Sequence, residues 1–387
     1  MLAIATGVTV ANIYYIQPLV EEIARSIGID LTEAGLLVTL LQVGYVVGLL
    51  FLAPLGDLVE NKKLILVTMA GLVVSLAGAA LAPRASVFMV AVVLIGLTAT
   101  ATQMIVPLAA HLAHAERRGH VVGTVMSGLL FGILLARPVA TLIAGAFGWR
   151  AVFMTSAAVM IGLLLVMLKV LPRRDPEPSF GYGALIASLW HVLISTPVLQ
   201  RRSAYQALLF AGFILFWTAM PILLSAPPFS LDHVAMSAFL LSGAAGALIA
   251  PISGKLADRG WGQAMTAFAI AAVALSFVLI ALLGRASLPA IVVAGIILDA
   301  GAQANLIAGQ RAIYALPGEI RSRLNALYLA GIFLGGSIGS AFSGYAVVHG
   351  GMSMVATIGL GFALIAALLF ATEFIGPRKR EQCAAEA

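Results

Sequence analysis

The stretch GKLADRG at positions 254–260 separates two long apolar runs, and the stretch PLGDLVENKK at positions 54–63 separates two others. An offset of 198 residues aligns these stretches and superposes Gly56 on Gly254, Leu58 on Leu256 and Glu60 on Asp258. A second pair, HAERRG at 114–119 and PGEIRS at 317–322, aligns at an offset of 203 residues. Because both matches fall in corresponding loops at nearly one offset, the sequence predicts two halves built from one repeated unit.

The composition shows what surrounds these loops. Hydrophobic residues make up 61% of the 387-residue chain and charged residues only 10%, whereas soluble domains carry about 25% charged residues. So few charges cannot cover a surface that meets water, so the composition excludes a water-soluble globule and indicates an integral membrane protein. The net charge of +6 does not indicate nucleic-acid binding, because the basic residues stand in short clusters between apolar runs.

Continuous apolar runs predict the fold class, since a run of about 20 such residues crosses the hydrocarbon core as a helix. We predict an all-α polytopic membrane protein with twelve spans, at 2–24, 33–56, 64–82, 86–110, 121–146, 149–171, 203–225, 233–254, 263–284, 288–314, 322–347 and 352–375. The apolar segment 184–193 is too short to span, and we expect it to lie along the membrane surface.

The proline-rich segment 172–178 opens a polar connection that divides the chain into six plus six predicted spans. We predict an N-terminal six-helix bundle, a cytoplasmic linker with an interfacial helix, a C-terminal six-helix bundle and a cytoplasmic tail, at 1–171, 172–202, 203–375 and 376–387. The first apolar run starts at Met1 and continues into a full span, so we expect no cleavable signal peptide.

The basic residues predict the orientation. If the N-terminus is inside, 17 of the 22 Lys and Arg residues fall on the inner side and four on the outer side, while Arg137 lies within a span. Basic residues near short loops stay in the cytoplasm, so both termini are predicted to be cytoplasmic and the odd-numbered spans to run outward.

Several motifs resemble those of the major facilitator superfamily. The loop at 254–260 looks like its signature loop, and the copy at 54–63 departs from that pattern at Glu60 and Asn61. The segment 132–138 resembles the Gly/Pro signature of the superfamily's antiporters, although Arg137 replaces a usual glycine. The stretches 12–18 and 323–328 look like a bacterial efflux subgroup related to drug/proton antiporters. The resemblance implies two pseudo-symmetric six-helix bundles in a bacterial inner membrane, with the first, fourth, seventh and tenth helices around a central cavity and the fifth helix near the tenth.

Two charged residues lie deep within predicted spans. Asp299 is about 16 Å from the outer end of its span and Arg137 about 15 Å, at 1.5 Å of rise per residue. Because charges inside a membrane are costly and usually functional, we expect Arg137 and Asp299 to approach each other or a shared water cluster. Asp299 could couple proton movement to substrate movement by alternating between a paired ionised state and a protonated state. The alternative is a fixed salt bridge that holds two helices together.

Polar and aromatic side chains in the predicted cavity-lining helices favour a moderately polar or amphipathic organic substrate. Any of them could instead hydrogen-bond between helices. The candidates are Asn12, Tyr15, Thr98, Thr102, Gln103, Trp217 and Gln303.

The signature loops could form gates, because a carboxylate at a helix start can be held by basic partners on a facing helix. We expect one gate between the loop at 54–63 and the start of the eleventh span, and another between the loop at 254–260 and the fifth span. The alternative is that these are ordinary topology-determining charges. The gate candidates are Gly56, Asp57, Glu60, Gly254, Asp258, Arg259, Arg117, Arg118, Arg321 and Arg323.

Glycines fill one face of the fifth and eleventh spans, and static close packing is one interpretation of them. They are Gly128, Gly132, Gly331, Gly335, Gly336, Gly339 and Gly344. Small residues allow helices to approach closely, so we expect these faces to form the interface between the two halves.

The sequence contains no nucleotide-binding loop, metal-ligand spacing or nucleophile with a nearby base, so we expect no cofactor, no metal and no enzymatic activity. We predict a monomeric, proton-coupled secondary transporter that exports a small organic compound by alternating access, with the lipid bilayer, protons and that compound as its partners. The alternatives are proton-coupled uptake of a metabolite and a membrane sensor that keeps the fold without transport. A costly acid at the midplane argues against the sensor.

Overall fold

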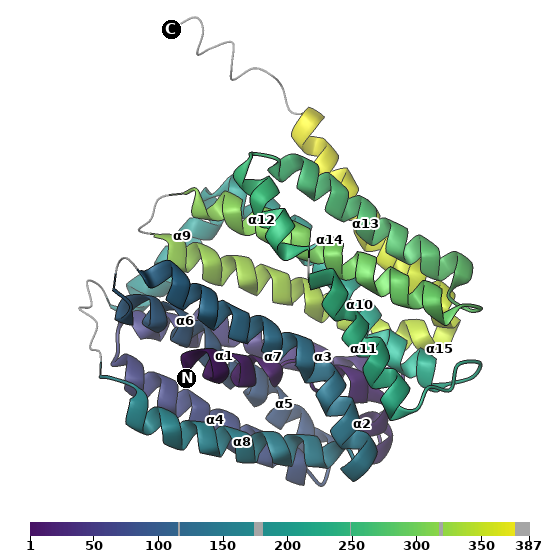
Figure 1. Cartoon of the computed structure of the whole chain (residues 1–387), viewed down its shortest axis with the longest axis horizontal. Helices are drawn as coiled ribbons and strands as arrows, with labels where there is room; N and C mark the ends of the chain where they lie inside the picture. The colour runs from purple at the N-terminus through teal and green to yellow at the C-terminus, as the bar shows by residue number, and fades with distance from the viewer. Residues whose placement is uncertain (115–116, 174–180, 248, 317–319, 376–387) are drawn as a thin grey trace, which may run out of the picture.

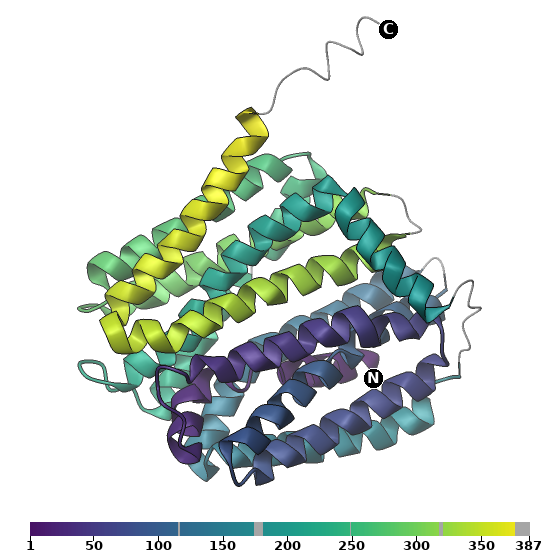
Figure 2. The same cartoon turned by 180° about the vertical axis from the view of Figure 1, so that it is seen from behind.

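The structure, a computed structural model, describes residues 1–114, 117–173, 181–247, 249–316 and 320–375. Within these ranges the chain is helical, and the described residues form no strand. The helices of the two halves form two groups that lie side by side, one coloured purple to blue-teal and the other green to yellow in Figures 1 and 2. The predicted tail and part of the predicted linker lie outside the described residues.

The first half consists of α1 to α8 and short irregular helical turns. The segment Gly48–Leu52 is a π-helix and the segments Gln17–Leu19 and Ala53–Asp57 are 3-10 helices. The α-helices are α1 (Leu2–Ala11), α2 (Val20–Ile27), α3 (Gly35–Val47), α4 (Asn61–Leu81), α5 (Ala85–Ala99), α6 (Ala101–Leu112), α7 (Arg118–Phe147) and α8 (Trp149–Val170).

The second half follows a linker helix, α9 (Tyr182–Ser195), which contains the segment predicted to lie along the membrane surface. Its long last helix, α15, is bent at Gly351, whose φ of 55° and ψ of −138° are not helical. The helices of this half are α10 (Pro197–Ser225), α11 (His233–Ala247), α12 (Ala250–Asp258), α13 (Gly262–Leu283), α14 (Leu288–Tyr314) and α15 (Arg321–Ile375).

Besides the fourth span, which is divided at Thr100 into α5 and α6, two predicted spans are not continuous helices. The first is interrupted between Ala11 and Val20, where the Asn12 amide donates to the carbonyls of Val8 and Thr9 at 2.9 and 3.1 Å and Pro18 has no N–H to donate. The eighth is divided into α11 and α12. Our prediction of unbroken helices was wrong at these places, because hydropathy reports the length of an apolar run and not its backbone geometry.

Nine helices in the described part of the chain are long and apolar enough to cross a membrane. One of them, Arg321–Phe374, contains the bend at Gly351, and the first and eighth predicted spans consist of shorter helices. The structure therefore confirms an all-helical multi-pass protein, whereas the count of twelve spans stays a prediction.

Each half has its own apolar core. One cluster of buried side chains comes mostly from the first half, where the rings of Phe88, Trp149 and Phe153 pack edge to face at centroid distances of 5.4 to 6.0 Å. A second cluster comes from the second half and includes Phe216, Phe277 and Val355. Two separate cores allow the halves to move relative to each other as units.

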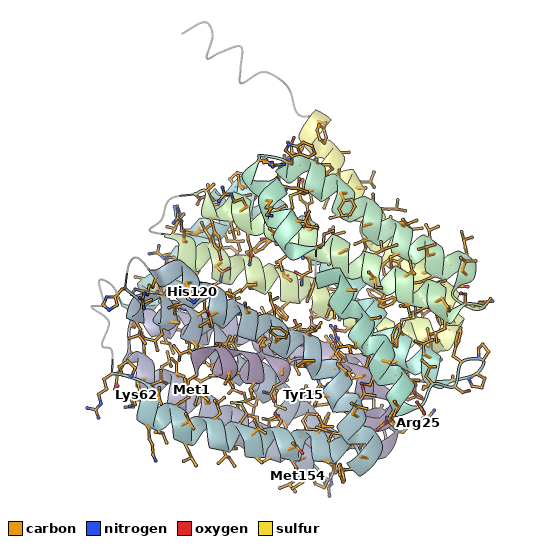
Figure 3. The ribbon with its side chains drawn as sticks, in the orientation of Figure 1. Met1, Tyr15, Arg25, Lys62, His120 and Met154 are labelled. Carbon is orange, nitrogen blue, oxygen red and sulfur yellow. The ribbon has the colours of Figure 1, made fainter. Side chains whose placement is uncertain are left out.

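The two ends of the molecule can be distinguished by the signature loops. Lys62 and His120 lie at one end of the helices in Figure 3, and Arg25 lies at the other. We call the end that carries residues 54–63 and 254–260 the loop end, and the other the opposite end.

Most of the glycines of α7 and α15 pack within their own half, so the prediction that they form the interface between the halves was wrong for these. Cβ atoms at Gly336 and Gly344 would meet Gln42 and Leu31 of the first half, so these two glycines lie at the interface as predicted. A Cβ atom at Gly128 or Gly132 would meet the backbone of α1, and one at Gly335 would meet the backbone of α10. A Cβ atom at Gly331 would meet Ser203, which also belongs to α10. Close approach of the first helix of each half to its fifth helix requires these small residues.

Candidate functional site

Arg137 and Asp299 lie at the junction of the two halves, both nearly fully buried. Arg137, on α7, donates from Nε to Oε1 of Gln17 at 2.7 Å, and its Nη2 has no hydrogen-bond partner among the described residues. Asp299, on α14, accepts a hydrogen bond from Nε1 of Trp217 at 2.8 Å. The two charges interact electrostatically, but they form no ion pair within 4.0 Å in the described part of the chain.

Three aromatic rings surround the Arg137 guanidinium. Its Cζ lies 5.1 Å from the ring centroid of Tyr14, 5.2 Å from that of Phe213 and 5.1 Å from that of Trp217. A desolvated cation over an aromatic face gains about 2 kcal/mol, so three rings offset part of the cost of burying this charge. The cation belongs to the first half, and two of the three rings belong to the second.

Two glycines of α11 make room for Asp299 and Trp217. A Cβ atom at Gly243 would lie 2.8 Å from both Oδ2 of Asp299 and Cζ2 of Trp217, and one at Gly246 would meet Cβ of Asp299. The acid and the indole therefore sit against bare backbone, which any larger residue at these positions would displace.

At the opposite end, hydrogen bonds join the two halves. Thr39 of α3 bonds to the Ser340 hydroxyl of α15 at 2.8 Å, and Ser237 of α11 donates to the Pro138 carbonyl of α7 at 3.1 Å. Further out, Ser225 donates to Glu21 at 2.9 Å. These contacts close the junction on the outer side of Arg137 and Asp299.

The outer rim carries the acidic residues Glu21, Glu22 and Asp232 beside Arg25 and His233. His233 lies 3.6 Å from Glu22 across the junction, and Arg25 pairs with Glu21 at 2.5 Å within α2. In the neighbouring loop, hydrogen bonds from the hydroxyl and the amide of Thr32 hold the pKa of Asp30 below its ordinary value.

Two cavities lie on either side of the charged pair. The outer one, of about 450 Å³, is lined by Pro18, Thr141 and Pro221 and by rim residues of α2, α10 and α11. Pro18 follows Gln17 directly, whereas Thr141 and Pro221 lie one helical turn after Arg137 and Trp217. The inner one, of about 750 Å³, lies at the loop end and takes its walls from both halves and from α9. Its polar lining includes Asp57, Asn61, Gln103, His111, Arg323 and Asn325, and its apolar lining includes Leu49, Met104, Leu185, Leu189 and Leu329.

The structure brings together only some of the residues predicted to line a cavity. Gln103 lines the inner cavity and donates to the Tyr45 hydroxyl at 3.1 Å. Trp217 is fully buried and contacts both charged residues, whereas Gln303 is half-buried one turn from Asp299.

The remaining cavity candidates make contacts of their own. Asn12 is directed to α8 and accepts a hydrogen bond from Ser156 at 2.6 Å, so its amide joins two helices. Thr98 bonds to the Leu94 carbonyl of its own helix at 2.6 Å, and Thr102 is fully buried. Tyr15 is half-buried against the first-half core, at the position labelled in Figure 3.

Only some of the gate candidates line the inner cavity. Gly56, Asp57 and Arg323 line that cavity, and Glu60 lies 4.0 Å from Arg173 of the linker. Arg117, Arg259 and Arg321 are exposed, and Gly254 is half-buried. The side chains of Arg118 and Asp258 lie outside what the structure describes, so the gate at the loop 254–260 stays a prediction.

Sequence reasoning missed five residues of this site: Tyr14, Gln17, Phe213, Gly243 and Gly246. Phe213 lies one helical turn before Trp217, so the helical spacing held a signal for it. Gln17 aligns with Trp217 at an offset of 200 residues, so the repeat held a signal for Gln17. The described residues contain no group of three or more His, Cys, Asp or Glu side chains that could hold a metal ion.

Comparison with known proteins places this arrangement in context. A sequence profile described as the Major Facilitator Superfamily matches residues 2–284 and 234–386. The uncharacterized transporter YgaY of Escherichia coli O157:H7 is 39% identical over 374 residues, covering 96% of this chain and 94% of the relative. The probable transporter SCO4007 of Streptomyces coelicolor is 31% identical over 359 residues, covering 92% of this chain and 83% of the relative.

Solved structures share the fold at low sequence identity. A bacterial homolog of the human lysosomal transporter Spinster, in an inward-facing and unoccupied conformation, has a TM-score of 0.76 at 15% identity, over 95% of this chain and 94% of the other. The nucleoside transporter NupG has a TM-score of 0.72 at 16% identity, over 96% of this chain and 98% of the other. At such identities the likeness concerns the fold alone.

Proposed function

Because this chain belongs to the major facilitator superfamily, we propose that it exports a small organic compound in exchange for protons, by alternating access across a bacterial inner membrane. The relatives named as transporters and the matching family profile make it a multi-pass membrane transporter and not an enzyme. The coupling, the direction and the substrate are the parts that we propose here.

The observation that carries the proposal is the buried charged pair between the halves. Asp299 belongs to the second half and Arg137 to the first, and the outer and inner cavities lie on either side of them. An acid at this junction can take up a proton from one side and release it to the other when the halves rock. A protonated Asp299 attracts Arg137 less than an ionised one, so the proton changes the contact that holds the halves together.

The exchange of protons for substrate proceeds in a fixed order of steps. The inner cavity receives the substrate at the loop end, which we assign to the cytoplasm from the distribution of Lys and Arg. The halves then rock, the substrate leaves outward, and protonation of Asp299 permits the return. The proton is released to the cytoplasm in the state described here, and its gradient drives the cycle.

The inner cavity supports an amphipathic substrate. Leucine and methionine side chains form its inner wall, while Asp57, Asn61, His111 and Arg323 lie among its polar lining. A volume of about 750 Å³ falls in the range of about 300–1,000 Å³ that small-molecule sites occupy. A compound with an apolar body and one polar end matches these walls.

The signature loops support a gating role at the same end. Asp57 and Arg323 line the inner cavity from opposite halves, so rocking that narrows the cavity brings them toward each other. A carboxylate and a guanidinium that approach more closely in the closed state would stabilise that state selectively.

The experiment begins with growth. Cells that express the chain are screened against toxic organic compounds, and a compound from which they are protected is loaded into proteoliposomes under an imposed pH gradient. We expect the compound to leave the proteoliposomes while protons enter them. The pH-sensitive dye pyranine, trapped inside, reports the entry of protons. Compound and proton that move in the same direction would establish uptake, and no movement of any compound would establish a protein without transport.

A further inference from the structure

Trp217 contacts both members of the charged pair with different parts of its indole. The edge of the ring donates from Nε1 to Asp299 at 2.8 Å, and the face of the ring lies 5.1 Å from Cζ of Arg137. The side chain is fully buried, and the rings of Phe216 and Phe239 pack against it at 5.0 and 5.4 Å. Its orientation is therefore fixed on all sides, with the acid at its edge and the cation over its face.

The indole stands where the two halves meet. Trp217, Phe213 and Asp299 belong to the second half, whereas Arg137 and Gln17 belong to the first. Because no ion pair joins Arg137 to Asp299 directly, the indole is the shared contact through which the acid can affect the hold on the cation. Pro221 and Thr141, one turn after Trp217 and Arg137, line the outer cavity. The contact between the indole and the guanidinium therefore lies at the inner end of that cavity.

We propose that Trp217 is the positioning residue that makes the outer closure depend on the charge of Asp299, an inference that rests on the proton coupling proposed above. An ionised Asp299 accepts a charge-assisted hydrogen bond that fixes the indole and increases the negative potential of its face. Arg137 is attracted to that face, so the outer side of the substrate-free protein stays closed while the acid is ionised. Protonation weakens the hydrogen bond, lowers the attraction and releases Arg137.

This arrangement prevents an uncoupled cycle. A transporter that has released its proton inward and holds no substrate must not return outward, because that step would waste the gradient. With Asp299 ionised and Trp217 bonded, the outer closure is at its strongest in that state.

Other titratable groups could make the outer closure depend on pH. Facing Asp299, α7 contributes the cation Arg137, α10 contributes the indole, and α11 contributes the glycines 243 and 246. At the rim, Glu22 faces His233, Glu21 faces Arg25, and Asp232 lines the same cavity and accepts from the Ala235 amide. A test must therefore separate Asp299 from the rim pair Glu22 and His233.

The test measures how accessible the junction is from outside. Ser237 is buried and bonds across the halves, so Ser237→Cys becomes reactive only when the outer side opens. The chain has a single native cysteine, which Cys383→Ser removes. The full-length protein with both substitutions is reconstituted in liposomes, and the rate of labelling by a membrane-impermeant thiosulfonate is recorded between pH 5 and 9. All variants carry the same reporter, so its own effect cancels.

Four variants distinguish the outcomes. Relative to the parent, Trp217→Phe keeps a ring under Arg137 but removes the N–H that donates to Asp299. We expect the pH midpoint of labelling to move upward by about one pH unit, because the ionised acid loses a charge-assisted hydrogen bond. Phe213→Leu removes a ring from Arg137 and should raise labelling at every pH without moving the midpoint. Asp299→Asn should give high labelling independent of pH, and His233→Gln should keep the parent's midpoint.

The proposal is overturned if Trp217→Phe has the parent's midpoint, or if His233→Gln and not Asp299→Asn removes the pH dependence. Matching melting temperatures in detergent show whether each variant is folded, and Asp299→Asn tests the same contact from its other partner. The labelling requires no substrate. A shifted midpoint in a protein that transports nothing would therefore contradict the proposed export while leaving the role of Trp217 intact.

Discussion

The two halves of this molecule repeat their packing and differ in their charges. At the outer closure, Thr39 of the first half and Ser237 of the second are equivalent at an offset of 198 residues, and each bonds to the facing half. In the cores, Gly132 and Gly335 are equivalent at an offset of 203, and each packs on the first helix of its own half. The repeat therefore preserves both the internal packing and the contacts that close the outer side.

The charged pair breaks the repeat. The residue equivalent to Arg137 is Ser340, and α5, which corresponds to α14, has no charged residue within Ala85–Ala99. Gln17 and Trp217 are equivalent at an offset of 200, and both contact Arg137, one with an amide and the other with an aromatic face. The comparison teaches that the duplicated positions build a symmetric frame, and that the positions where the copies diverge carry the proposed chemistry.

The largest expected effect concerns Arg137 and Ser340, which are equivalent in the repeat but differ in charge. Arg137→Leu removes the cation that interacts with Asp299 and the hydrogen bond to Gln17. We expect transport in proteoliposomes to fall by at least about 100-fold, since about 2.7 kcal/mol corresponds to that factor. Ser340→Ala, at the equivalent position, removes the hydrogen bonds to Thr39 and to the Ser337 carbonyl and should cost about 1–2 kcal/mol. Equal losses in the two variants would show that the divergence has no functional meaning.

An intermediate loss of stability, equal in the two halves, is expected at the equivalent glycines. Gly132→Ala and Gly335→Ala each place a methyl group against the backbone of a neighbouring helix, and each should cost about 2 kcal/mol. The melting temperature of the purified protein in detergent measures this loss. Gly162→Ala is the matched control, because a Cβ atom there meets nothing within 4 Å, and it should leave the melting temperature unchanged or slightly higher. A loss at one of the first two positions alone would contradict the equivalence.

The smallest effect tests the outer closure. Thr39→Val removes the hydrogen bonds to the Ser337 carbonyl and the Ser340 hydroxyl, and Ser237→Ala removes the one to the Pro138 carbonyl. Each change should weaken the closed state by about 1 kcal/mol or more, or at least roughly 5-fold in population. Distances between spin labels placed at the opposite end of the two halves report that population. The two changes should add in the double variant, because they lie in different helix pairs. Effects of opposite sign would show that the two contacts do not close the same side.

Much of the fold could be predicted from the sequence, because its determinants are local. Apolar runs, the proline-rich break and the paired loops indicated an all-helical membrane protein with two related halves. The interruption of the first span could not be predicted in this way, since it depends on the Asn12 amide and Pro18 within an otherwise apolar run. The glycine faces were correctly read as close contacts but mostly assigned to the wrong partners, because spacing on one helix does not identify the helix that it meets.

The site was less accessible to sequence reasoning. The cost of intramembrane charge singled out Arg137 and Asp299 without any structure. That reasoning could not place Trp217 between them or show the rings around the guanidinium, because these contacts join helices far apart in the chain. Asn12 looked like a cavity residue by its polarity, whereas its amide is bonded to Ser156 of α8.

The account depends most on Asp299, so the most direct measurement compares wild-type protein with Asp299→Asn in two assays on the same proteoliposomes. Asparagine keeps the size and can still accept from Trp217, but it cannot carry a proton through the cycle. We predict that Asp299→Asn retains exchange of labelled for unlabelled compound without a gradient and loses accumulation driven by a pH gradient. Undiminished accumulation under the pH gradient would contradict proton coupling through this residue.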